Sequence, residues 1–90
     1  MIAFKIKVKG KVQGVFYRKY TVEKAQSLSL CGWVKNREDG SVEIFAEGDK
    51  QIIDMLISWC KTGPKNAVVM DIDVSEVPLQ GYSDFRIIHN

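Results

Sequence analysis

The chain has 90 residues, enough for one small domain with a single hydrophobic core, and we expect one domain over residues 1–90. Hydrophobic residues make up 46% of it and charged residues 27%, proportions that are typical of a packed globular protein and exclude an intrinsically disordered chain. The formal net charge of +2, from 13 basic and 11 acidic side chains, is too even to indicate a polyanion or a membrane surface as partner.

The first predicted element is a strand over residues 2–9. Apolar side chains alternate there with Ala3 and three lysines, so one face of the strand is expected to be buried and the other wet. A loop with two glycines follows over residues 10–16. From Tyr17 the apolar spacing lengthens to a helical period that continues through Leu30, and Gly32 is the expected stop of this helix.

Two strands are predicted next, over residues 33–36 and 41–47. The pair Asp39-Gly40 between them is a hairpin turn signal, and the alternation in the second strand directs Val42, Ile44 and Ala46 inward. The two segments therefore predict a β-hairpin.

A second helix is predicted to begin after Asp49, a plausible N-cap, and to end at Gly63-Pro64. Its expected apolar face consists of Ile52, Met55, Leu56 and Trp59. Alternation over residues 68–74 then indicates a strand, and Phe85 and Ile87 indicate a short last one.

The resulting order, β-α-β-β-α-β with a short extra C-terminal strand, predicts an α+β fold of the ferredoxin-like, split βαβ type. In this fold an antiparallel sheet carries both helices on one face. The same architecture serves enzymes, RNA-binding domains and regulatory modules, so the fold class alone does not specify a function.

Composition excludes several kinds of chemistry. A single histidine, His89, excludes a His-based catalytic triad and a His-based metal site. Cys31 and Cys60 lack metal-ligand spacing and are too few for a disulfide framework, so we expect both in apolar packing positions, although an oxidising compartment would allow a single disulfide between them. No apolar run approaches the roughly 20 residues of a membrane helix, and no signal peptide opens the chain, so a cytoplasmic protein is expected.

The loop before the first helix is the first candidate site. A glycine-containing loop that leads into a helix N-terminus directs free N–H groups toward one point, which suits a bound phosphate. Arg18 lies in or just before the first helical turn, where a cation opposes the helix dipole unless an anion is shared between them. The alternative is a solvated surface arginine beside an ordinary turn. The loop matches neither GxxxxGK[ST] nor GxGxxG.

Asn36, at the end of the strand before the hairpin turn, is the second candidate. Its carboxamide offers both a donor and an acceptor and can hold a water and a phosphoryl oxygen together, but asparagine is also a common turn residue.

Cys31 and Arg37 match the C-x5-R spacing of cysteine-dependent phosphatases. However, Cys31 is expected at the C-terminal end of a helix, where the dipole raises a thiol pKa, and a strand is predicted between the two residues.

The basic side chains are concentrated in one part of the sequence. Residues 1–40 contain nine basic and three acidic side chains, a net charge of +6, whereas residues 41–90 have a net charge of −4. Both candidate residues lie in the basic part. An anionic ligand is therefore expected there.

Two long segments carry a resemblance to a known family. The segment GKVQGVFYR, residues 10–18, resembles the first signature of the acylphosphatases, and GWVKNREDGSVEIFAEG, residues 32–48, matches their second signature at every fixed position. The resemblance extends over essentially the whole chain, including the YSDF segment at residues 82–85. One departure is Tyr17, where the family usually has phenylalanine or sometimes methionine. The added hydroxyl is expected to affect packing or rate without contacting the implied catalytic pair.

The resemblance implies hydrolysis of a small acyl phosphate to a carboxylate and inorganic phosphate, without metal or cofactor, by a monomer with no nucleic-acid or membrane partner. Arg18 and the backbone N–H groups of the loop would hold the phosphoryl oxygens, and Asn36 would orient the attacking water. The implied loop residues are Gln13, Gly14, Val15, Phe16 and Tyr17.

Two alternatives remain from a different functional class. An RNA-recognition motif has the same element order, but its third strand is rich in aromatic residues, whereas GSVEIFAEG carries glutamates. The other alternative is a catalytically quiet ferredoxin-like ligand-binding module within a larger assembly. The presence of both Arg18 and Asn36 argues against it.

Overall fold

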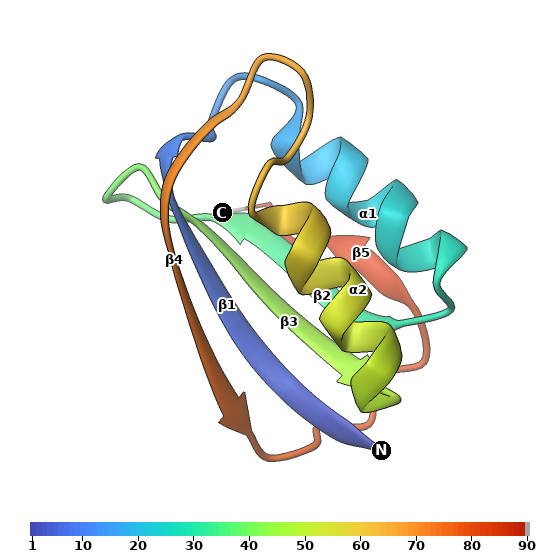
Figure 1. Cartoon of the computed structure of the whole chain (residues 1–90). Helices are drawn as coiled ribbons and strands as arrows, with labels where there is room; N and C mark the ends of the chain where they lie inside the picture. The colour runs from blue at the N-terminus through green and yellow to red at the C-terminus, as the bar shows by residue number, and fades with distance from the viewer. Residues whose placement is uncertain (90) are drawn as a thin grey trace.

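Two helices lie on one face of a five-stranded sheet in the structure, a computed structural model that describes residues 1–89 (Figure 1). The elements in chain order are β1 (Ile2–Lys11), α1 (Tyr17–Ser27), β2 (Cys31–Asn36), β3 (Val42–Gly48), α2 (Lys50–Cys60), β4 (Val68–Val77) and β5 (Phe85–Ile87). The βαββαβ order and the extra C-terminal strand are confirmed. Neither helix within residues 1–89 has the length and apolar character that a bilayer crossing requires.

The strand order across the sheet is β4-β1-β3-β2-β5. The first four strands pair antiparallel as predicted, but β5 pairs parallel to β2, so the complete sheet is mixed. The reason is the path of the chain. Residues 78–84 leave β4 at the end of the sheet where β2 begins, so the chain re-enters the sheet in the same direction as β2 (Figure 1).

The core fills the space between the helices and the sheet. Ile6 and Val8 from β1 and Ile44 from β3 are fully buried there, which confirms the alternation read from the sequence. The side chain of Asp49 caps α2 by accepting a 3.0 Å hydrogen bond from the Gln51 N–H. The predicted α2 face is correct for Leu56, which is buried, and for Ile52 and Trp59, which pack partly buried against the core. It is wrong in two details: Ile53 and Cys60 are also buried, and Met55 is 50% exposed.

Helix α1 ends earlier than predicted, and its stop is not Gly32. Ser29 adopts a left-handed conformation, and its N–H bonds the Gln26 carbonyl while the Leu30 N–H bonds the Ala25 carbonyl, both at 3.0 Å. This is the Schellman arrangement of a helix C-terminus. Gly32 lies within β2 instead, where a Cβ atom would stand 1.9 Å from the Phe45 carbonyl oxygen, so the neighbouring strand leaves room only for glycine.

The sheet face without helices is partly covered. Residues 78–84 pass beside Glu47, whose carboxylate accepts hydrogen bonds from the backbone N–H groups of Gln80, Gly81 and Tyr82 and is only 2% exposed. Burial opposes ionisation of this group, but the three N–H donors outweigh it and hold the pKa of Glu47 below its ordinary value. The carboxylate therefore fastens the β4–β5 connection to the central strand.

Candidate active site

The junction between β1 and α1 exposes backbone donors. Phe16, at the N-cap of α1, has a left-handed conformation (φ 64°) and caps the helix with no side-chain hydrogen bond. The first backbone bond of the helix runs from the Tyr20 N–H to the Phe16 carbonyl at 3.1 Å. The N–H groups of residues 17–19 therefore precede the hydrogen-bonded ladder of the helix. A left-handed residue followed by a helical one makes a concave set of N–H groups that suits an anion.

The left-handed backbone at Phe16 is strained. For a bulky residue this conformation costs on the order of 1–3 kcal/mol, and the Phe16 side chain gains little burial in return because it is 69% exposed. Gly14, with φ 75°, was expected to supply an unusual backbone angle and does so. Nothing in the residue type of Phe16 predicts its conformation. Strain of this kind concentrates at functional sites.

Gln13 connects this loop to the β2–β3 hairpin. Its side-chain Nε2 donates hydrogen bonds to the carbonyl oxygens of Arg37 at 2.7 Å and Ser41 at 2.9 Å. These two carbonyls belong to the turn that follows Asn36. The amide of Gln13 thereby fixes the loop relative to the end of β2.

The loop, the start of α1 and the end of β2 enclose a cleft of about 220 Å³. It is lined by Val12, Gly14, Phe16, Tyr17, Arg18 and Asn36. Arg18 and Asn36 are both half-buried, and the Asn36 Oδ1 atom is shielded from solvent. The two candidate residues thus line the same cleft although they are 18 positions apart in the sequence. Two of the predicted loop residues, Gln13 and Val15, do not line it.

The distribution of ion pairs distinguishes Arg18 from the nearby Arg37. Arg37 donates from Nη1 to Glu43 Oε1 at 3.0 Å, and Lys5 and Lys35 share the same carboxylate. Within residues 1–89, no carboxylate lies in ion-pair distance of Arg18. Its guanidinium is therefore available to an anion in the cleft.

A group of lysines within residues 1–89 also has no carboxylate in ion-pair distance. Within the described chain, the other basic side chains without a carboxylate partner are Lys11, Lys19, Lys24, Lys61 and Lys65. Lys11 and Lys19 are the direct sequence neighbours of Val12 and Arg18, which line the cleft, and Lys61 and Lys65 follow the end of α2. The lysines of β1 that made the first part of the sequence so basic are instead largely paired with acidic residues, for example Lys7 with Asp39 at 2.9 Å. The described basic side chains without a carboxylate partner therefore include two from residues 41–90, Lys61 and Lys65.

Tyr17 is fully buried, and its hydroxyl serves the fold. It donates a 2.7 Å hydrogen bond to the Cys60 carbonyl at the end of α2, and its ring lies 5.5 Å from the ring of Trp59. Burial raises the pKa of the Tyr17 hydroxyl, which keeps it protonated. The Tyr17 hydroxyl, which is the departure from the family pattern at this position, thus links α1 to the end of α2.

Neither cysteine has the surroundings of a nucleophile. Burial raises the pKa of the Cys60 thiol to about 12, and both cysteines are free thiols. Cys31 begins β2 and Arg37 follows its end, so the whole strand separates them, as predicted. Among the described residues, no three His, Cys, Asp or Glu side chains gather where they can hold a metal ion.

The fold and the cleft together define an α+β domain of the ferredoxin-like type with a candidate anion site between a loop, a helix N-terminus and a strand end. Residues 4–87 match the family model described as Acylphosphatase. The chain is 49% identical over 88 residues to the acylphosphatase of Acaryochloris marina, which covers 98% of this chain and 95% of the relative. The chain therefore belongs to the acylphosphatase family.

Solved structures agree with this assignment. The crystal structure of acylphosphatase from Bacillus subtilis superimposes with a TM-score of 0.96 at 40% identity and covers 99% of this chain and 100% of that one. The structure of full-length HypF in a phosphate- and nucleotide-bound form contains a similar domain, with a TM-score of 0.88 at 32% identity. That match covers 98% of this chain but only 12% of HypF. The fold thus occurs both alone and as part of a much longer protein.

Proposed function

We propose that this chain is an acylphosphatase that hydrolyses the carboxyl–phosphate bond of small acyl phosphates without metal or cofactor. The observation that carries the proposal is the shared cleft. Arg18 and Asn36 line it together with Gly14 and Phe16 of the loop. A cation, a helix N-terminus and a carboxamide are the groups that positioning and charge stabilisation of a phosphoryl group require.

Each residue has a distinct role in the proposal. Arg18 binds two phosphoryl oxygens through its planar guanidinium, and the backbone N–H groups of the predicted loop residues that line the cleft, Gly14, Phe16 and Tyr17, bind the others. Asn36 orients a water molecule for in-line attack on phosphorus. The water oxygen bonds to phosphorus as the bond from phosphorus to the acyl oxygen breaks, and the electron pair leaves with the carboxylate. The proton of the water goes to a phosphoryl oxygen of the substrate.

The leaving group explains why so few acid–base residues are needed. The conjugate acid of a carboxylate has a pKa near about 4, so it departs without protonation by a general acid. The remaining work is neutralisation of charge and alignment of water. Lys11 and Lys19, which adjoin the cleft-lining residues Val12 and Arg18 and have no carboxylate partner within residues 1–89, support attraction of a phosphate dianion.

The proposal includes a monomeric, cytoplasmic protein that does not bind nucleic acid. Arg18 and Asn36 line one cleft within the same chain, so the site does not need a second copy to bring them together, and two free cysteines suit the reducing cytoplasm. The open sheet face is poorly suited to stacking of bases, because Phe45 is only 3% exposed and Trp33 is stacked against it. The lysines beside them, Lys5 and Lys35, are engaged by Glu43.

The test is release of inorganic phosphate from acetyl phosphate by the purified chain, with and without EDTA, and with phenyl phosphate as the control ester. We expect turnover of the acyl phosphate that EDTA does not change. Turnover of phenyl phosphate should be far slower, because phenoxide is a poorer leaving group and the cleft contains no general acid. Absence of acetyl phosphate hydrolysis would contradict the activity, and loss of it in EDTA would contradict the metal-independent mechanism.

A further inference from the structure

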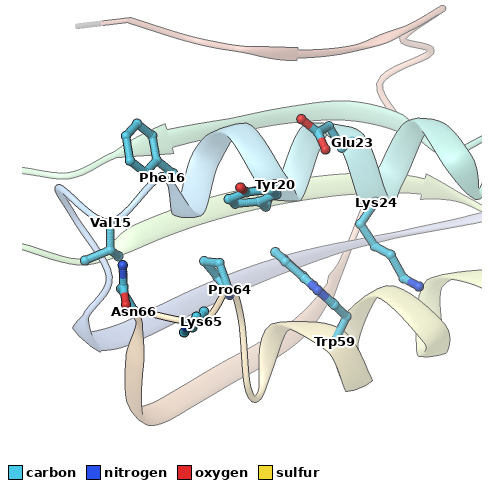
Figure 2. Close-up of a pocket in the computed structure, with 9 residues that line it drawn as sticks. All are labelled: Val15, Phe16, Tyr20, Glu23, Lys24, Trp59, Pro64, Lys65 and Asn66. Carbon is cyan, nitrogen blue, oxygen red and sulfur yellow. The ribbon is translucent and has the colours of Figure 1, made fainter.

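Two further hollows share a lining residue with the cleft. One of about 610 Å³ lies between α1 and the segment that follows α2, and Figure 2 shows the side chains that line it from both sides. It shares Phe16 with the cleft and is lined by neither Arg18 nor Asn36. The other, of about 330 Å³, lies at the β2–β3 turn and is lined by Asn36 and by Lys35 and Arg37, which flank it in the sequence. Asn36 thus borders both the cleft and a charged turn.

Asn36 and the charged side chains next to it lie on opposite faces of the sheet. Asn36 pairs with Val42 across the ladder, and Val42 is buried in the core, so the Asn36 side chain is on the helix face. Glu43 is the next residue of β3, so its side chain is on the face without helices. Arg37 extends to that face as well, because its Nη1 donates to Glu43 Oε1 at 3.0 Å. Consecutive residues at the end of β2 therefore face the cleft and an ion pair behind it.

Glu43 is a firm anchor for this arginine. Its side chain is only 10% exposed, and besides Arg37 it pairs with Lys5 of β1 at 3.7 Å and with Lys35 of β2 at 3.8 Å. One carboxylate of the central strand thus contacts cations from both neighbouring strands and from the turn. A charge network of this kind restrains its members more than an isolated exposed pair does.

The main chain of Arg37 is held as well. Its N–H, which belongs to the peptide group shared with Asn36, donates to the Ser41 carbonyl at 2.9 Å. Its carbonyl accepts the 2.7 Å hydrogen bond from Gln13 Nε2. The ion pair with Glu43 adds a restraint from the face of the sheet opposite the cleft, on the residue that directly follows Asn36.

We infer that Arg37 is a positioning residue that acts on the reaction through Asn36, with Glu43 as its anchor. The inference rests on the proposed function, in which Asn36 orients the attacking water. Neither Arg37 nor Glu43 lines the cleft, so the pair sets the direction of the Asn36 carboxamide without binding the phosphoryl group. Its loss is therefore expected to lower the rate of the chemical step and to leave phosphate binding intact.

The experiment measures acetyl phosphate hydrolysis by Arg37→Ala, with inorganic phosphate as a competitive inhibitor. The Arg37 side chain is 42% exposed, so the variant should fold. We expect kcat to fall roughly threefold to tenfold, because misaligned water attacks more slowly, while the inhibition constant for phosphate stays within about twofold. Arg37→Lys should recover most of the lost kcat, since an ammonium can replace the single charged hydrogen bond to Glu43.

The sharpest comparison is Arg37→Ala in an Asn36→Ala protein. There it should change kcat by less than about twofold, because the group that Arg37 positions is absent. Arg86→Ala in the wild-type background is the matched control and should leave kcat unchanged, since this guanidinium is also paired with a carboxylate, that of Asp84 at 2.6 Å, but lies in β5.

Two results would overturn the positioning role while the hydrolytic activity stands. One is an unchanged kcat in Arg37→Ala, and the other is the same fractional loss with and without the Asn36 side chain. If the wild-type protein does not hydrolyse acetyl phosphate, the proposed function itself fails and this inference with it.

Discussion

The side-chain amide of Gln13 donates a 2.7 Å hydrogen bond to the carbonyl oxygen of Arg37, the residue directly after Asn36. The Gln13 amide also donates to the Ser41 carbonyl, so one side chain spans from the loop before α1 to both ends of the hairpin turn. Gln13 does not line the cleft. Its position makes it a positioning residue that sets the distance between the loop and the end of β2.

Gln13→Ala should therefore reduce activity without removing any group that contacts the substrate. We expect kcat/KM for acetyl phosphate to fall about tenfold or more, because a small displacement of aligned groups is costly in rate. Gln26→Ala is the matched control, since Gln26 Nε2 also donates to a carbonyl of a distant strand, that of Phe85 at 3.2 Å. The control should lose some stability and no activity. Equal activity of the two variants would contradict the positioning role.

Tyr17→Phe should destabilise the fold. The change removes the buried hydrogen bond to Cys60 and leaves that carbonyl oxygen without its donor, at a cost of about 1–3 kcal/mol in the free energy of unfolding. The matched control is Tyr20→Phe. The Tyr20 hydroxyl is on an exposed side chain, so its removal should change the free energy of unfolding by less than about 0.5 kcal/mol. Urea unfolding of the three proteins measures both values. A Tyr17→Phe protein as stable as wild type would show that the hydroxyl contributes nothing to the junction of the two helices.

The lowered pKa of Glu47 predicts how the stability of the fold depends on pH. Its pKa is lower in the folded chain than its ordinary value of 4.5, so the charged carboxylate stabilises the fold above that pH. This contribution is lost as the pH falls below 4.5 and through the folded pKa. We expect Glu47→Gln to unfold more easily than wild type at pH 7 by about 1.5–3 kcal/mol.

The difference between the two proteins should shrink steadily as the pH is lowered through this range. Asp39 and Asp84 also have pKa values held below their ordinary range by hydrogen bonds, from Ser41 and Arg86 respectively, but they are present in both proteins and cancel. Denaturant unfolding at a series of pH values measures the difference. A difference that does not change with pH would contradict the role of the Glu47 charge.

Much of the fold follows from local patterns in the sequence. Alternation in β1, the Asp39-Gly40 turn and the Asp49 cap each act over a few residues, and all three appear in the structure. The features that could not be predicted depend on contacts across the sequence. The parallel addition of β5 depends on where the β4–β5 connection crosses, and Ser29 rather than Gly32 ends α1 because Gly32 is needed against Phe45.

The candidate site is likewise divided between features that the sequence predicts and features that depend on the folded chain. The positions of Arg18 and Asn36 in the sequence make both residues candidates, the family resemblance implies their roles, and the loop glycine Gly14 has the expected unusual backbone angle. The left-handed backbone of Phe16 could not be predicted, because phenylalanine has no preference for that region. The groove between α1 and the segment after α2 could not be predicted either. Its walls come from elements far apart in the sequence that only the fold brings together (Figure 2).

Asn36→Ala separates orientation of water from binding of phosphate. If Asn36 acts on the attacking water, the variant should lose about 10²-fold in kcat and keep nearly the wild-type inhibition constant for inorganic phosphate. Steady-state kinetics with phosphate as a competitive inhibitor gives both numbers. A weakened inhibition by phosphate with an unchanged kcat would reverse the assignment and make Asn36 a phosphate ligand.

The most direct test of the account is kcat/KM for acetyl phosphate in Arg18→Lys, with Arg86→Lys as the control. Both changes keep the charge, but Arg86 is paired with Asp84 at 2.6 Å at the edge of the sheet, whereas Arg18 lines the cleft. Lysine cannot bind two phosphoryl oxygens in a planar fork, so Arg18→Lys should lose about 10²-fold or more and the control should stay within about twofold. An Arg18→Lys protein as active as its control would contradict the account.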